Sequence, residues 1–401
     1  MPYNIMWNEI EILGLNNDSD ALGISGSEYL EDISKISIEQ DLRWLQGITK
    51  DSSNSWLAFV TSKDLRVQGY APIFVHASDL QFCLGEVTFY TFPIQRYQLS
   101  NPILNENAQE QAVGENSSLS FCLEELFNIL KSVVPARGVL FLHAIPISSH
   151  LYMLLNTTSK IHSIFHVIPY GPMYQRRTIL LLGTFNDYLK ELSSKTRQDL
   201  KRTKKKFQEK VGSAWQLVRI DSSDQINEFL AKVEQISKKT YQWKLLGLGV
   251  CQNSTHEKQM YVAANYGWLK CYLLMVDEQP IAFQIGYDYQ GTYLAHDIGY
   301  DPTWAKLQVG IFLHTQIIED LLNNAPHIKK FDFLLGDSVH KERLSTHSHQ
   351  ERHFYLIPRT FKNFFLAKSF SGINKFSSSI GIFLAKYNLK NVIKKKIRRH
   401  C

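Results

Sequence analysis

The chain has 401 residues, more than the roughly 250 that one hydrophobic core usually serves, so two domains are expected. Hydrophobic residues make up 44% of the sequence, the share of an ordinary globular protein. The net charge of +6 is unevenly distributed: residues 1–130 contain 18 acidic and 6 basic residues, whereas 12 basic and no acidic residues follow Glu351.

The cysteines and the hydropathy pattern exclude several protein classes. The five cysteines are odd in number and form no C-x-x-C pair, which fits neither a zinc site nor a disulfide framework, so no metal is expected. The first residues, "MPYNIMWNEIEILG", lack the basic start and apolar stretch of a signal peptide, and no window has the ~18 apolar residues of a membrane span. We therefore expect a protein of the reducing cytosol.

The first half of the chain combines helices with a strand pair. A helix is expected over 28–46, two alternating apolar runs predict a hairpin over 55–76, and a second helix is expected over 120–133. The polar stretch 101–119 between them is predicted to be a long loop.

The second half repeats this design. Helices are expected over 185–210, 222–240 and 307–323; three strands with turns at "DEQP" and "YQG" are expected over 267–302, and a further strand over 328–335. Strand hairpins flanked by helices occur in both halves of the sequence. This repetition predicts an α/β (α+β) fold with two tandem domains, each a mixed sheet flanked by helices. The predicted domains are 1–185 and 186–360, followed by a basic helical tail, 361–401.

A concentrated basic segment begins the second domain. Seven Lys and Arg residues occur between Lys195 and Lys206, and helical spacing places Arg197 and Lys201 on one side. Such a face could attract the phosphates of coenzyme A (CoA), an anionic sugar or tRNA, or it could simply be a solvated helix surface.

Several motifs together resemble a known family. They are "LSSKTRQDLKRTKKKF" (192–207), "SKKTYQW" (237–243), "GWLKCYLLMVDEQPIAFQIGY" (267–287), "GYDPTWAKLQVG" (299–310) and "FDFLLGDSVHKERLS" (331–345). In this order they resemble the GNAT-type acetyltransferases of the CelD branch, which are related to FemAB proteins. The resemblance covers about residues 190–358, and the N-terminal half resembles a degenerate first GNAT unit only loosely.

The sequence departs from that family at three places. Gln308-Val309-Gly310 stands where members commonly have Ser-Pro-Gly, His340-Lys341 stands where they have Tyr-Lys, and Leu344 replaces a frequent aromatic residue. The second departure removes the tyrosine that would otherwise be expected as a proton donor.

The resemblance implies a donor site for acetyl-CoA. The donor would lie between diverging strands 292–300 and 331–335, with its pyrophosphate at the start of the following helix, where unpaired N–H groups and the helix dipole attract anions. Those N–H groups would belong to Gln308, Val309, Gly310 and Ile311, and Lys306 could add charge. An ordinary helix start is the alternative interpretation.

Candidate catalytic residues follow from the need for a base near the nucleophile. They are His296 on strand 292–300 and, in the segment after strand 331–335, Asp337, His340 and Lys341. Asp337 is equally suited to cap a helix over 338–345. Acceptor contacts are expected from Arg197, Tyr241 and Asp301, although Tyr241 could instead be an aromatic residue of the core.

The resulting expectation is an acyl-CoA-dependent N- or O-acyltransferase, with acetyl-CoA as co-substrate. Its acceptor would be a sugar or amino sugar, free or lipid-linked, of a cell-surface polysaccharide. The alternatives are a FemAB-like transferase that uses aminoacyl-tRNA and a catalytically inert membrane-associated scaffold; DNA is not expected as a partner.

The tail, 361–401, interleaves Phe, Leu and Ile with Lys and ends in "KKKIRRHC". This pattern is typical of a helix lying on an anionic leaflet, so peripheral attachment to the inner face of the membrane is expected. A disordered basic tail and a helix packed on the body are the alternatives.

Overall fold

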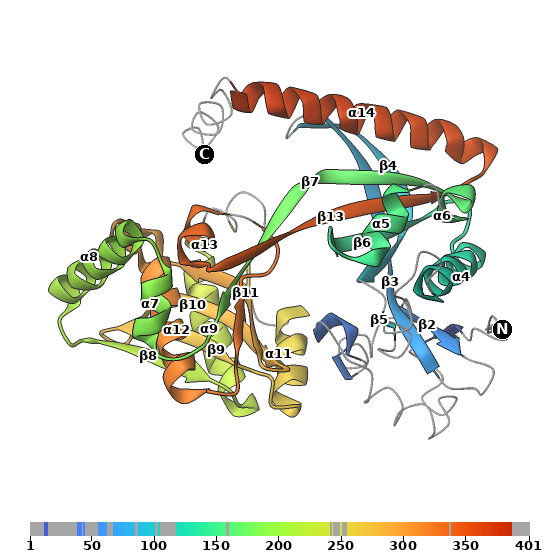
Figure 1. Cartoon of the computed structure of the whole chain (residues 1–401). Helices are drawn as coiled ribbons and strands as arrows, with labels where there is room; N and C mark the ends of the chain where they lie inside the picture. Colours follow the sequence, from blue (N-terminus) through green and yellow to red (C-terminus); the bar gives the residue numbers. More distant parts are fainter. Residues whose placement is uncertain are drawn as a thin grey trace. The chain divides into compact units, whose positions relative to one another are not determined.

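The structure is a computed structural model in which the chain forms two compact units (Figure 1). Unit 1 comprises Met1–Met173 with Gln350–Cys401, and unit 2 comprises Tyr174–His349. The residues described by the structure are 12–14, 38–41, 43–44, 55–61, 67–84, 87–100, 103–104, 118–157, 160–240, 243, 249–250, 255–336 and 338–386.

Unit 1 contains a mixed sheet with the strand order β1-β2-β3-β4-β6-β13, and β5 pairs with β3. Its strands are β1 (Ile12–Gly14), β2 (Ser55–Thr61), β3 (Val67–Leu84), β4 (Val87–Ser100), β5 (Ile103–Leu104), β6 (Gly138–Pro146) and β13 (His347–Pro358). The pairs β1–β2, β2–β3, β3–β4, β3–β5 and β6–β13 are antiparallel, and β4–β6 is parallel.

Alternation of side chains gives this sheet two buried faces. Leu140 of β6 and Phe354 of β13 point into one cluster, whereas Phe141 and Tyr355 point into the other. The helical segments of unit 1 are η1 (Ile38–Gln40), α4 (Ser118–Val133), α5 (His150–Asn156), α6 (Lys160–Ile164) and α14 (Phe361–Lys386). Residues of α4, α5 and α6 contribute to the first cluster and residues of α14 to the second.

In unit 2 the strands have the order β7-β12-β11-β10-β9-β8. Its strands are β7 (Phe165–Leu180), which begins in unit 1, β8 (Trp215–Ile220), β9 (Cys271–Val276), β10 (Gln279–Tyr289), β11 (Thr292–Tyr300) and β12 (Lys330–Asp332). Tight turns connect β9 to β10 and β10 to β11, at residues with positive φ: Asp277, Glu278, Gln290 and Gly291. Only β11–β12 is parallel among the described pairs of this unit.

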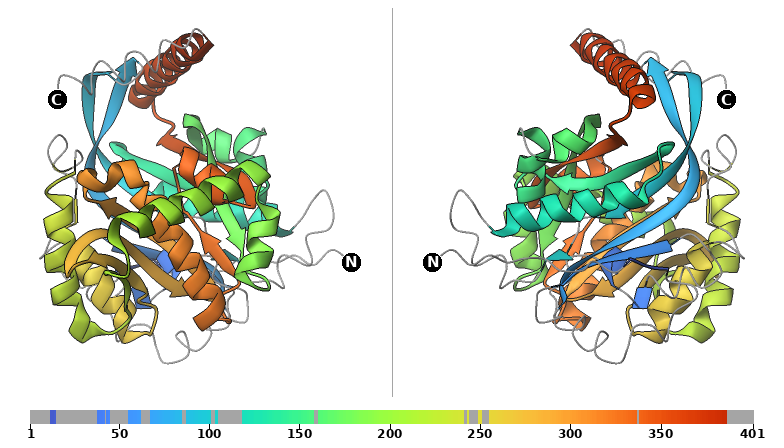
Figure 2. Two further views of the ribbon diagram at one scale, coloured as in Figure 1. Left: turned by 90° about the vertical axis from the view of Figure 1, so that its left-hand side faces the viewer. Right: turned by 90° about the vertical axis from the view of Figure 1, so that its right-hand side faces the viewer.

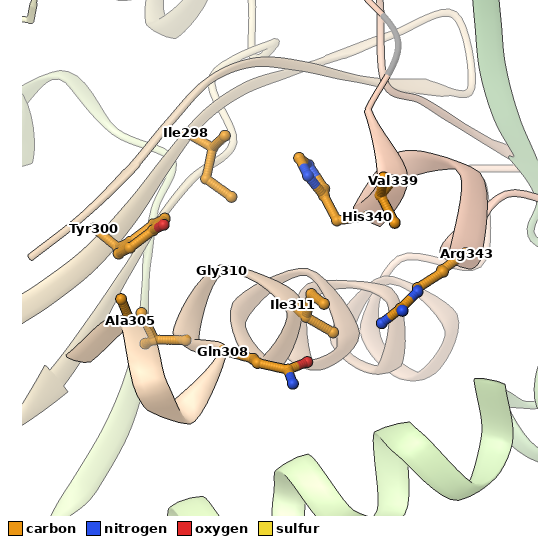
Figure 3. A pocket seen from close by; sticks show the side chains of 10 residues that line it. Ile298, Tyr300, Ala305, Gln308, Gly310, Ile311, Val339, His340 and Arg343 are labelled. Carbon is orange, nitrogen blue, oxygen red and sulfur yellow. The ribbon is translucent and has the colours of Figure 1, made fainter. Parts of the chain in front are cut away.

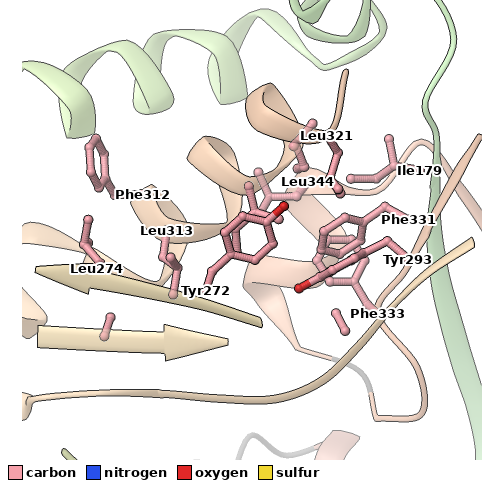
Figure 4. Packing of buried hydrophobic residues seen from close by; sticks show 14 of the residues in the cluster. Ile179, Tyr272, Leu274, Tyr293, Phe312, Leu313, Leu321, Phe331, Phe333 and Leu344 are labelled. Atoms are coloured by element: carbon pink, nitrogen blue, oxygen red, sulfur yellow. The ribbon is translucent and has the colours of Figure 1, made fainter. Parts of the chain in front are cut away.

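The largest buried cluster of unit 2 joins α7, α8 and α12 to one face of this sheet. Phe207 of α8 stacks on Phe312 of α12 with ring centroids 4.1 Å apart, and Phe331 of β12 is fully buried below α12 (Figure 4). The helical segments of unit 2 are α7 (Phe185–Glu191), α8 (Ser194–Val211), η2 (Ser223–Gln225), α9 (Ile226–Ser237), α11 (Thr255–Asn265), η3 (Pro302–Leu307), α12 (Val309–Asn324) and α13 (Val339–Leu344). The cluster therefore fixes α12 against the face of β10 and β11, next to the candidate site.

The α/β prediction is confirmed, and each unit has a mixed sheet flanked by helices. The units differ from the predicted domains 1–185 and 186–360, because β13 returns to pair with β6 and brings residues from 350 onward into unit 1. The helix expected over 28–46 lies mostly outside the described residues.

The single helix expected over 185–210 is two helices. Ser193 begins α8 as its N-cap, and its hydroxyl accepts a hydrogen bond from the backbone N–H of Thr196 at 3.2 Å. The guanidinium of Arg197 donates to the carbonyls of Leu189, Lys190 and Leu192 and so satisfies the end of α7.

Candidate active site

The site begins where β11 and β12 diverge. The two strands are paired in parallel only from Thr292–Lys330 to Leu294–Asp332, and β11 then continues to Tyr300 paired with β10. The chain leaves β12 at once, because the N–H of Phe333 donates to the carbonyl of Arg177 in β7 at 3.0 Å. The divergence predicted for strands 292–300 and 331–335 is thus present, with a shorter second strand.

Asp332 fixes this point of divergence. Nε of Arg176 lies 3.0 Å from both of its carboxylate oxygens, and the N–H of Leu334 donates to Oδ1 at 2.9 Å. Asp332 is 2% exposed and the side chain of Arg176 is 20% exposed, so the carboxylate is buried and held by a mostly buried guanidinium. The sequence analysis assigned Asp332 no role.

A pocket of about 400 Å³ lies between the end of β11, the start of α12 and α13 (Figure 3). It is lined by Ile298, Tyr300, Ala305, Gln308, Val309, Gly310, Ile311, Val339, His340 and Arg343. This volume is within the range of small-molecule sites, and the lining set contains no carboxylate. The structure therefore brings all four predicted helix-start residues and His340 to one cavity.

The floor of the pocket is the N-terminus of α12. Gln308 has a left-handed backbone (φ 53°, ψ 42°) and makes no side-chain capping hydrogen bond. The N–H groups of Gln308 and Ile311 already donate to the carbonyls of Ala305 and Gln308, at 3.0 and 2.9 Å, so the N–H groups that could meet a ligand at the positive end of the helix dipole are those of Val309 and Gly310. Because α12 is 16 residues long, its start is a suitable place for a phosphate group.

His340 of α13 forms part of the pocket wall. Its Nδ1 lies 3.1 Å from the Ser338 hydroxyl, whereas Nε2 is buried and has no hydrogen-bond partner among the described residues. Burial, with the nearby charge of Lys341, lowers the pKa of His340 below its usual value of 6.5. The imidazole is consequently neutral at pH 7 and able to accept a proton.

A second histidine, His314 of α12, packs against His340. The two rings are nearly parallel, with centroids 5.7 Å apart, and His314 Nε2 lies 2.9 Å from Oε1 of Gln284. Burial, with the charges of His340 and Lys341, lowers the pKa of His314 to about 3. The sequence analysis missed His314, although a histidine inside the apolar helix 309–324 was a visible signal.

Two other catalytic candidates, His296 and Lys341, are not among the residues that line the pocket. His296 is the extra residue of a β-bulge in β11, since Ile285 pairs with Asp297 and Gly286 with Ala295, and its ring contacts Tyr287. Lys341 Nζ donates to the carbonyl of Phe333 at 2.7 Å and so closes the turn after β12. Asp337 lies outside the described residues.

The residues predicted to contact the acceptor, and Lys306, are not among the residues that line the pocket or lie outside the described residues. Asp301 caps η3 through the N–H of Thr303 at 2.9 Å and pairs with Lys239 Nζ at 2.6 Å. Arg197 serves α7 as described above, and Lys306, in η3, is exposed and outside the pocket lining. Tyr241 lies outside the described residues.

Arg343 is a further residue that the sequence analysis missed. It lines the pocket from α13, and its Nη1 lies 3.9 Å from Asp199 of α8. Its position, three residues after His340 on a helix, places both side chains on the same side of α13. A guanidinium at the rim is suited to a phosphate oxygen.

Comparisons with known proteins agree with this geometry. Residues 194–342 match the acetyltransferase (GNAT) domain family, and this segment includes every pocket residue except Arg343. The matched segment lies within unit 2 and supports the predicted GNAT superfamily but no particular branch within it. No curated protein matches the chain.

Solved structures similar to the chain are distant in sequence. FemX has a TM-score of 0.53 at 9% identity, over 86% of this chain and 96% of that chain. L-PGS from Bacillus licheniformis has a TM-score of 0.48 at 14% identity, over 90% and 98% of the two chains. A tandem GNAT protein from the clavulanic acid biosynthesis pathway has a TM-score of 0.47 at 9% identity, over 86% and 98%.

Proposed function

We propose that the chain is an acyltransferase that takes an acyl group, expected to be acetyl, from CoA. The observation that supports this most directly is the pocket between α13 and the end of β11, beyond its pairing with β12, with the N-terminus of α12 as its floor. The acceptor in this proposal is a hydroxyl or amine of a sugar or amino-sugar intermediate of a cell-surface polysaccharide.

The charge of the pocket favours a donor with phosphates. The start of α12 presents the N–H groups of Val309 and Gly310, Arg343 adds a guanidinium, and none of the described residues that line the cavity is acidic. The apolar lining residues Ile298, Val309 and Ile311 suit the uncharged pantetheine arm of CoA.

His340 is the candidate general base. In the proposed step the acceptor O–H or N–H attacks the thioester carbonyl carbon, a C–O or C–N bond forms, and the C–S bond breaks. His340 Nε2 takes the acceptor proton and returns it to the departing thiolate, so that CoA leaves as the thiol. The neutral state of His340 at pH 7 is the state that this role requires.

Calorimetry with the full chain tests the donor. Acetyl-CoA is expected to bind at least about 100-fold more tightly than S-acetylpantetheine, which has the same thioester but lacks the phosphates at α12. Equal affinity for the two compounds would contradict phosphate binding at α12 and the proposal with it.

Aminoacyl transfer from tRNA is the second candidate, and α8 is the feature that favours it. Six of its basic side chains are exposed: Lys195, Lys201, Arg202, Lys205, Lys206 and Lys210. Exposed bases on one helix attract a polyanion. A gel shift with charged tRNA, together with no binding of acetyl-CoA, would favour this candidate, and inert behaviour in both assays would favour a scaffold.

A further inference from the structure

We propose that α14 is an interfacial helix whose outward face binds the surface of a bilayer that contains anionic lipids. Among the described residues, no helix is long and apolar enough to cross a membrane, so the proposed contact is with the surface. The proposal concerns unit 1 and does not depend on the acyl-transfer reaction proposed for unit 2.

One side of α14 is fixed to unit 1. Asn363, Ala367 and Phe370 are 8%, 3% and 0% exposed, and the ring of Phe370 lies 5.3 Å from Phe82 and 5.4 Å from Tyr355. The Asn363 amide donates to the carbonyls of Ala136 and Pro358, both at 2.9 Å. These contacts determine which side of the helix faces away from unit 1.

The opposite side carries large aromatic residues. Phe361 is 83% exposed, Phe365 and Phe376 are each 60% exposed, and Phe364 is 44% exposed. At about 100° per residue, Phe361, Phe365 and Phe376 lie within about 60° of one another around the helix axis. Single exposed aromatic residues are ordinary, but several on one outward helix face indicate an interaction surface. The packing of α14 along β3 and β4 is visible in Figure 2.

Lysines accompany these rings. Lys368 and Lys375 lie on the same outward side, and Lys368 Nζ is 5.7 Å from the ring of Phe364. The printed sequence has no acidic residue after Glu351. Phenyl rings among lysines are the pattern of a helix whose rings enter the headgroup region while the ammonium groups meet lipid phosphates.

This combination favours a lipid surface over other partners. A nucleic acid would bind the lysines but leave the exposed phenyl rings in water. An apolar protein groove would bury the rings but make no use of the lysines. An anionic bilayer uses both, because it offers phosphates and an apolar layer at successive depths.

The test compares vesicle sedimentation of full chains that differ only on this face. The vesicles contain phosphatidylglycerol in phosphatidylcholine, with pure phosphatidylcholine as the uncharged comparison. We expect the double variant Phe361→Ser/Phe365→Ser to bind the anionic vesicles at least about tenfold more weakly than the unmodified chain. The matched control is Ile147→Ser/Met153→Ser, which removes two apolar side chains that are 37% and 48% exposed elsewhere on unit 1 and should bind normally.

The charge requirement is tested with Lys368→Gln/Lys375→Gln. This variant should bind less at low salt and differ little from the unmodified chain at high salt, where surface charges are screened. Unchanged melting temperatures would exclude misfolding, since all four substituted positions are on the outward side. Undiminished binding by the phenylalanine variant would overturn the proposal and assign the attachment to basic residues alone. Failure of the unmodified chain to bind, or equal binding to uncharged vesicles, would overturn it as well.

Discussion

Gly310 is the residue at which the donor site can be blocked with the smallest change. A carbon added there would lie 3.6 Å from Tyr300 Cδ1 and 3.8 Å from Ile298 Cδ1, which is ordinary contact distance, and both neighbours line the pocket. A side chain at this position would thus enter the cavity without disturbing the backbone of α12.

We predict that Gly310→Val folds normally and binds acetyl-CoA at least about tenfold more weakly, a loss of about 1.4 kcal/mol. The cause is occupation of the space above the helix start, and calorimetry measures it. Gly372→Val is the matched control, because that glycine is in α14 and an added carbon there meets nothing within 4 Å. Equal affinity of the two variants would place the donor elsewhere.

His314 gives a prediction about stability and pH. Its pKa is about 3 in the folded chain and near 6.5 when unfolded, so between these values the unfolded state binds more protons. The stability associated with neutral His314 is complete above pH 6.5 and is lost as the pH falls toward 3.

The expected slope from this one group is about 1.4 kcal/mol per pH unit in the middle of that interval. Urea unfolding at several pH values should show a shallower dependence for His314→Gln, which has similar volume and no titrating ring. Parallel curves for the variant and the unmodified chain would show that the pKa of His314 is the same in the folded and unfolded chains. The sequence could not predict this shift, since burial of one helix position depends on what packs over it.

At the scale of elements, the pocket depends on a strand that stops early. β12 ends at Asp332, where Arg176 of β7 holds the carboxylate and the chain turns toward β7 while β11 continues. The sequence predicted the three strands of 267–302 and the helix 307–323 well, because turn residues and apolar periodicity mark them. It extended β12 to residue 335, since "FDFLL" is apolar and the partner that ends the strand lies more than 150 residues away in sequence.

We predict that Asp332→Asn lowers the free energy of unfolding by about 3 kcal/mol, because it removes the charge of a buried carboxylate that lies 3.0 Å from Nε of Arg176. Acetyl-CoA affinity should fall as well, although Asp332 is not among the residues lining the pocket, because the divergence of β11 and β12 becomes less well fixed.

Asp221→Asn is the control for this change. Asp221 pairs with Arg219 at 3.0 Å, but both side chains are more than 40% exposed, so the cost should be below about 1 kcal/mol. Chemical denaturation and calorimetry on the two variants make the comparison. If the Asp332→Asn chain is destabilised but binds acetyl-CoA with normal affinity, the ion pair contributes to stability and not to the donor site.

At the scale of the whole molecule, the chain passes from unit 1 to unit 2 within β7 and back within β13. The sequence indicated two α/β halves but placed the boundary near 185, because a linear reading assigns each segment to its neighbours. Pairing of Tyr355 with Phe141 and Leu356 with Leu140 joins residues more than 200 positions apart, and local patterns carry no record of such pairing.

We predict that a fragment of residues 1–185 does not unfold cooperatively, whereas a fragment of 174–349 does. The first lacks Phe354, Tyr355 and Leu356, which are each at most 2% exposed in unit 1, and the second retains every strand pair described for unit 2. Near-ultraviolet circular dichroism during thermal unfolding distinguishes the outcomes. A sharp transition in the fragment 1–185 would show that β13 is dispensable.

The return of β13 also sets an order of events during synthesis. All of unit 2 leaves the ribosome before Gln350–Pro358. The strands of unit 2 can therefore pair while β6 still lacks its antiparallel partner β13. An unpaired strand edge beside incomplete apolar faces is a template for wrong pairing. The nascent chain is therefore most vulnerable to aggregation after unit 2 has folded and before β13 emerges. A pause in translation within that interval would increase misfolding of unit 1 and leave the folding of unit 2 unchanged.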